Sequence, residues 1–108
     1  MELATVLTGQ TKSGAIELGN GVQGGVLTRI ETPAILDSTG LTLEVSTDGG
    51  TTFVASTGAS ITVAASKSIY IDPLYTRGGT HCKLVFGTAE TTGGTSRTIK
   101  CVVESRKG

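Results

Sequence analysis

The sequence predicts an all-β fold, a single antiparallel β-sandwich of the jelly-roll or immunoglobulin-like kind with about seven to nine short strands. Three observations predict it. Nineteen of the 108 residues are Thr, which, like Val and Ile, favours a pleated and half-buried backbone. Sixteen Gly residues supply turns at short intervals along the chain. No apolar pattern keeps a helical period over three turns, so we expect no amphipathic helix.

The clearest predicted strand is 41–46, because Leu41, Leu43 and Val45 alternate with polar residues and so bury one face. Turn signals bound the other predicted strands, which are 3–8, 15–18, 26–32, 52–54, 60–63, 68–71, 82–86 and 97–104, and residues 34–36 lead into a predicted turn at 37–40. We expect one domain over 1–108. Within it, 1–14 is an N-terminal arm or an edge strand, and 105–108 is a frayed tail.

Composition restricts the function. The chain has two Phe, two Tyr and no Trp, so the core is lean and we expect added stability from oligomerisation or docking. Nine basic and nine acidic residues give a formal charge of zero, which disfavours direct binding of nucleic acid. No apolar run approaches the roughly 20 residues of a membrane span. The start, 1–4, lacks the features of a secretory signal, so we expect synthesis in a cytoplasm and no membrane partner.

Residues 46–53 match the Asp-box pattern, Ser-x-Asp-x-Gly-x-Thr-aromatic, at every defined position. In this pattern the Asp accepts backbone N–H bonds, the Gly takes a positive φ, and the aromatic residue enters the core. The motif resembles the repeated hairpins of sialidases and other β-propellers, where it lies away from the active site. We therefore predict a structural hairpin. Its residues are Ser46, Asp48, Gly50, Thr52 and Phe53.

The two cysteines, Cys82 and Cys101, test the pairing of two predicted strands. If 82–86 and 97–101 form an antiparallel pair with Phe86 opposite Arg97, then Cys82 lies opposite Cys101 on one apolar face. The two residues are then either a pair of buried thiols or a cross-strand disulfide. Two cysteines are too few for a metal site, so we predict no metal.

The sequence shows no catalytic grouping. His81 is the only histidine, and no nucleophile or acid is placed to work with it, so we expect no enzyme activity. Asp37, Asp48 and Asp72 fall at predicted turns without the spacing of a calcium loop. Residues 19–25 lack the Lys-Ser/Thr of a phosphate loop and read as a turn. We therefore predict no cofactor.

Four stretches, in their order and spacing, resemble a family of small proteins encoded among the head genes of tailed bacteriophages and prophages. The stretches are 13–19, 41–53, 68–73, and 83–88 followed by Arg97-Thr98-Ile99 and a closing Arg106. The resemblance covers roughly residues 13–106. Cys82 and Cys101 depart from the family's pattern.

This resemblance implies a non-enzymatic structural protein of the virion, a capsid decoration (cement) protein made in the host cytoplasm and located on the capsid surface. Its implied partners are the major capsid protein and copies of itself. A neck or tail-completion protein is the nearest alternative. A carbohydrate-binding or host-receptor module is a weaker one, because only Tyr70 and Tyr75 could serve as exposed aromatic platforms.

Overall fold

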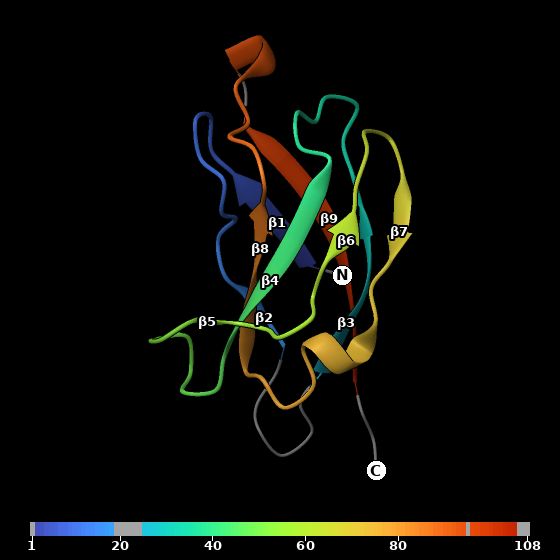
Figure 1. Cartoon of the computed structure of the whole chain (residues 1–108). Helices are drawn as coiled ribbons and strands as arrows, with labels where there is room; N and C mark the ends of the chain where they lie inside the picture. Colours follow the sequence, from blue (N-terminus) through green and yellow to red (C-terminus); the bar gives the residue numbers. More distant parts are fainter. Residues whose placement is uncertain (1, 19–24, 95, 106–108) are drawn as a thin grey trace.

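The computed structural model describes residues 2–18, 25–94 and 96–105. These residues form nine strands in two antiparallel sheets that pack face to face (Figure 1), which confirms the predicted all-β sandwich. Sheet A has the order β1 (Glu2–Val6), β9 (Arg97–Ser105), β3 (Gly25–Glu31), β7 (Ser68–Tyr70). Sheet B has the order β2 (Ile16–Glu17), β8 (His81–Phe86), β4 (Gly40–Ser46), β5 (Val54–Ala55), and β6 (Ile61–Thr62) pairs with the start of β4. Two 3₁₀ helices, η1 (Pro73–Tyr75) and η2 (Thr92–Gly94), complete the elements.

Alternation of apolar and polar residues explains the two central strands of sheet B. In β4, Leu41 and Leu43 are buried while Thr42 between them is exposed. In β8, the side chains of Cys82 and Leu84 face the core. Each strand buries one face against sheet A and leaves the other half-exposed or exposed, as a sandwich requires, except that Ser46 at the end of β4 is buried.

The predicted pairing of the last two long strands is wrong. β8 pairs with β2 and β4 in sheet B, whereas β9 pairs with β1 and β3 in sheet A. Cys82 therefore lies opposite Ile16 and Val45 within its sheet, and Cys101 lies opposite Ile30. The prediction was wrong because alternating apolar residues show only that a strand buries one face. They do not show whether two such strands are neighbours in one sheet or lie in opposite sheets across the core.

Residues 32–39 form the connection from β3 in sheet A to β4 in sheet B, and the segment 34–36 within it forms no strand. The N-terminal strand β1 occupies the edge of sheet A and pairs with β9 through all five of its residues. Most of the predicted turn at 19–25 and of the tail at 105–108 lies outside the described residues, although Gly25 opens β3 and Ser105 ends β9.

The core lies between the sheets and is built almost wholly from aliphatic side chains. Phe86 is the one aromatic residue among the buried core residues of the described chain. Aliphatic cores of this size are modest, because a domain of about 100 residues buries only somewhat over half of its unfolded-state surface. Two groups of hydrogen-bonded polar side chains, one at each end of the sandwich, supplement the packing of this core.

Candidate functional site

The predicted hairpin joins β4 to β5, and hydrogen bonds hold its turn. The Asp48 Oδ1 atom accepts from the backbone amides of Thr51 and Thr52 at 3.2 and 3.0 Å. The Ser46 hydroxyl donates to the same oxygen at 2.7 Å and accepts from the Gly50 amide at 2.9 Å. These are the backbone bonds that the Asp-box pattern predicts. Ser46 and Asp48 thus replace, within the turn, the backbone partners that a sheet would otherwise provide.

The backbone conformation at Gly50 requires glycine. Its φ of 92° is in the left-handed region, which strains other residues. An added Cβ would lie 3.4 Å from the ring of His81, an ordinary van der Waals contact, so the constraint comes from the backbone. The His81 Nδ1 atom in turn lies 3.1 Å from the Thr80 hydroxyl oxygen, which accepts from the Gly49 amide. The only histidine is therefore packed under the turn.

The charge of the hairpin is fixed. The Thr52 backbone amide, followed by the Ser46 hydroxyl, lowers the pKa of Asp48 from 3.8 to about 2. Asp48 itself is exposed at the tip of the turn. Its carboxylate is therefore ionised at every pH at which the protein is expected to work.

Phe53 does not enter the core, contrary to the prediction. Val54 lies opposite Val45 in an inward-facing row, so the preceding residue, Phe53, projects to the outer face of sheet B. There it is half-exposed, and the Lys83 ammonium lies 4.5 Å from the centre of its ring. This cation–π contact replaces the predicted core packing.

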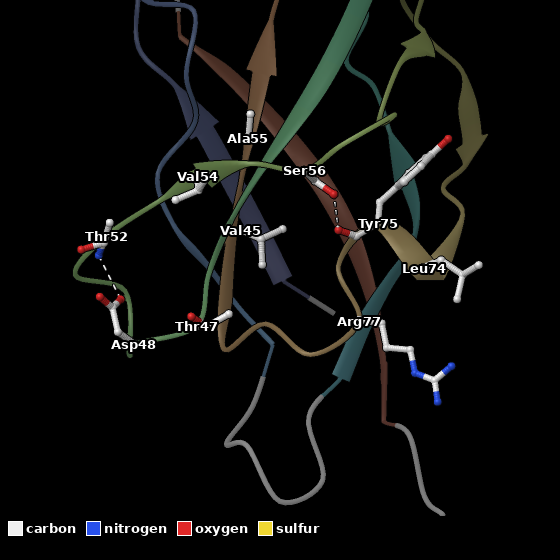
Figure 2. Close-up of a pocket in the computed structure, with 10 residues that line it drawn as sticks. All are labelled: Val45, Thr47, Asp48, Thr52, Val54, Ala55, Ser56, Leu74, Tyr75 and Arg77. Atoms are coloured by element: carbon white, nitrogen blue, oxygen red, sulfur yellow. Dashed lines mark hydrogen bonds between the residues drawn. The ribbon is translucent and has the colours of Figure 1, made fainter.

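A groove of about 460 Å³ lies between the hairpin and η1 (Figure 2). Its lining comes from β4, the hairpin, β5 and η1 with the residues next to it: Val45, Thr47, Asp48, Thr52, Val54, Ala55, Ser56, Leu74, Tyr75 and Arg77. One direct bond links the two walls, since the Ser56 hydroxyl donates to the Tyr75 carbonyl oxygen at 2.7 Å. Figure 2 shows Asp48 on the hairpin side and Arg77 on the η1 side.

The η1 wall is held in place at both of its ends. The Asp72 side chain caps the helix by accepting from the Leu74 amide at 3.0 Å, and Pro73 occupies its first position. At the other end, the buried Thr76 hydroxyl accepts from the Leu27 amide of β3 at 2.9 Å. The groove is therefore a preformed feature of the fold.

A second polar arrangement, at the opposite end of the sandwich, was missed by sequence reasoning. Glu90 is 0 % exposed and accepts four hydrogen bonds: from the amides of Asp37 (2.8 Å) and Ser38 (3.0 Å), the Ser38 hydroxyl (2.7 Å) and Arg97 Nε (2.9 Å). Arg97 is buried as well and lies 3.6 Å from the Asp37 carboxylate. A signal for this cluster is present in the sequence, because Arg97 occupies the apolar face shared by Ile99 and implies a buried partner.

Hydrogen bonding decides the ionisation of Glu90. Burial alone would raise the pKa of its carboxyl group, but the bonds from the Asp37 amide, Ser38 and Arg97 outweigh burial and lower the pKa. Glu90 is therefore a carboxylate. It joins its own loop, between β8 and β9, to Asp37 and Ser38 before β4 and to Arg97 at the start of β9. The cluster is structural, since each of these contacts joins two parts of the chain.

The two cysteines face the core from opposite sheets, and both are thiols outside any disulfide, with 0 % exposure. Burial, with a smaller effect of Cys101, raises the pKa of Cys82 to about 12. Cys82 is therefore protonated and unreactive. The cross-strand placement predicted within one sheet is wrong, because the pair spans the sandwich.

The described residues include no group of three or more His, Cys, Asp or Glu side chains that could hold a metal ion. Within the same part of the chain, no helix is long and apolar enough to cross a membrane. No protein-family model, curated protein or solved structure matches this chain. A functional proposal therefore depends on the residues and on their arrangement in the fold.

Proposed function

We propose that this protein is a non-enzymatic structural protein of a tailed-phage virion, a capsid decoration (cement) protein that docks on the head and stabilises it. The observation behind the proposal is the order and spacing of the four stretches that resemble the phage head-gene family. Its partners are the major capsid protein and further copies of the chain, and its place is the capsid surface.

The positions of the four stretches support the proposal. They contain β2, β4 with its turn, β7, and most of β8 with the start of β9. These elements come from both sheets and include the central strands of sheet B. A resemblance distributed over the frame of the fold is what two proteins with the same sandwich would share.

The use of the polar side chains supports a structural role as well. Asp48 and Ser46 hold the hairpin, and Glu90 and Arg97 hold the loops at the other end. A decoration protein needs a rigid body, since each copy buries a modest area on the capsid and the symmetry of the lattice multiplies the effect.

Copy number in purified virions tests the proposal most directly. Densitometry of virion proteins on a gel, normalised to the major capsid protein, should give hundreds of copies, as expected for a site repeated over the lattice. About a dozen copies would instead indicate the neck or tail-completion role, because those positions have the symmetry of a single vertex.

A binding experiment tests the stabilising activity. The purified protein should bind expanded heads that lack it and raise the temperature at which they break. Salt should weaken the binding only mildly, because a chain with a formal charge of zero gains little from long-range attraction. Heads that bind the protein without any change in breakage temperature would contradict a cement function.

A further inference from the structure

The groove beside η1 leaves apolar side chains in solvent. Val54 is 65 % exposed and Leu74 is 66 % exposed, and both line the groove. Val54 belongs to an inward-facing row of sheet B, since it lies opposite Val45, which packs against the core. Its side chain therefore points between the sheets at a place where the sandwich is not closed. The groove is an open side of the core.

The strand that forms one wall of the groove has an unpaired edge. β5 is the last strand in the order of sheet B, and both of its residues are exposed. No further strand joins β5 within the described residues. Natural proteins usually protect such edges with charge, a bulge or a partner, and Val54 and Ala55 provide no charge.

The two walls of the groove have opposite charges. The Asp48 carboxylate lies on the hairpin wall and is ionised, and the Arg77 guanidinium lies on the other wall and is exposed. No ion pair of the described chain involves Arg77. Each wall thus has one exposed aliphatic side chain and one charged side chain, with the sign reversed from wall to wall.

We propose that this groove is the contact surface between two copies of this chain, related by a two-fold axis that passes through it. A two-fold interface uses the same patch on both copies, so the patch must be complementary to itself. The groove meets this requirement, because exchanging its walls places Val54 against the other copy's Leu74 and Asp48 against the other copy's Arg77. The formal charge of zero adds no net repulsion between copies.

The proposal concerns self-association alone. It can therefore be wrong while the virion role is right, and it can be right while the virion role is wrong. It is tested by sedimentation velocity of the full chain over a wide concentration range. Wild type should change from monomer to dimer as concentration rises. Leu74→Ser should raise the dissociation constant about tenfold or more, because burial of a Leu side chain in the interface is lost.

Leu7→Ser is the matched control. Leu7 is 62 % exposed and directly follows β1, whose last residue lies toward the other end of the sandwich from η1 (Figure 1). The same substitution there should leave the dissociation constant unchanged. Both variants should keep the wild-type melting curve by circular dichroism, since both side chains are already exposed.

Charge reversal tests the proposed dimer independently of the apolar contact. Arg77→Glu should weaken association, because it faces the other copy's Asp48 with like charge, whereas Arg29→Glu on the exposed face of sheet A should not. A chain that is monomeric at every concentration would overturn the proposal. Equal effects of Leu74→Ser and Leu7→Ser, or association only with a different protein, would overturn it as well.

Discussion

At each end of the sandwich, a carboxylate accepts hydrogen bonds from backbone amides that have no partner in a sheet, but the two carboxylates differ in burial. At one end, Asp48 accepts the amides of Thr51 and Thr52 and holds the turn between β4 and β5. At the other, Glu90 accepts the amides of Asp37 and Ser38 and holds two loops together. Both carboxylates replace the backbone partners that irregular chain segments lack. Both have lowered pKa values for that reason.

The two arrangements differ in burial and in the length of chain that they span. Asp48 is exposed, and its partners lie within four residues of it in the sequence. Glu90 is fully buried, and it bonds Asp37 and Ser38 across more than 50 residues. Water can replace the bonds of Asp48 when they are lost, but it cannot reach those of Glu90 without local unfolding. The Glu90 end should therefore dominate the stability of the fold.

Removal of Arg97 should give the largest effect. Arg97→Ala leaves the buried Glu90 carboxylate without its cation, and the loss of a partner from a buried ion pair costs about 3–5 kcal/mol. Denaturant unfolding followed by circular dichroism measures this loss. Arg29→Ala is the control, since the same change at an exposed position should alter the free energy of unfolding by less than about 0.5 kcal/mol.

A double variant separates the charge from the packing. Combining Arg97→Ala with Glu90→Gln removes both buried charges and keeps an acceptor for the amides of Asp37 and Ser38, so it should cost less than Arg97→Ala alone. If Arg97→Ala behaves like a surface substitution, the cluster does not stabilise the fold and the comparison between the two ends fails.

Acid should weaken both ends of the sandwich. A carboxyl group whose pKa is lower in the folded state stabilises the fold above its unfolded pKa, and the contribution disappears as pH falls through the folded pKa. The contribution of Glu90 should begin to fall below its ordinary value of 4.5, and that of Asp48 should fall between 3.8 and about 2. Thermal melts from pH 7 to pH 2 measure both.

Two substitutions assign these ranges. Glu90→Gln should lower the melting temperature at pH 7 and flatten its decline just below pH 4.5. Asp48→Asn should flatten the decline between pH 3.8 and about 2. Identical profiles for Glu90→Gln and wild type would show that Glu90 is not ionised in the folded protein.

The separation in sequence between each carboxylate and its partners explains what the sequence could and could not predict. The bonds of Asp48 lie within one turn, so a local pattern predicts them. Phe53 was misplaced because the pattern does not state on which side of the sheet the second strand continues. Glu90 has no local signature, since its partners Asp37 and Ser38 are far away in the sequence. Its only trace was Arg97 on an apolar face.

The strand pairing failed for a related reason. Burial patterns told which side chains of β8 and β9 face inward, and both cysteines are indeed buried. They did not tell which strands are neighbours, because that depends on the path of the connecting loop. The 87–96 loop crosses from sheet B to sheet A, and Glu90 within it is tied to the 34–39 connection.

The reactivity of the two cysteine thiols tests the assignment of β8 and β9 to opposite sheets. Cys82 and Cys101 should not react with an alkylating reagent at pH 8 in the folded protein, since both are fully buried and the pKa of Cys82 is about 12. Both should react after denaturation. Mass spectrometry counts the added groups. Rapid reaction in the native state, or a disulfide that blocks reaction after denaturation, would contradict the placement of two buried thiols in the core.

Asp48→Ala should produce the smallest loss of stability in the set, and only at the hairpin. The carboxylate is exposed, so water can take over the amides of Thr51 and Thr52 when it is removed. The melting temperature should fall by less than in Glu90→Gln, and hydrogen exchange should quicken at these two amides while the amides of β9 stay protected. Gly50→Ala is the companion variant. It should loosen the same turn by strain, because φ at this position is 92°, in the left-handed region that a side chain disfavours.

The comparison of these two variants decides what Asp48 does beyond the turn. If Asp48→Ala and Gly50→Ala loosen the hairpin alike and weaken self-association alike, Asp48 acts by shaping the groove wall. If Asp48→Ala weakens association more than Gly50→Ala does, its charge also contacts the other copy's Arg77. An Asp48→Ala variant that melts like wild type but no longer binds heads would show that Asp48 contacts the capsid. The exposed end of the sandwich would then be a binding surface, and the buried end alone would hold the fold.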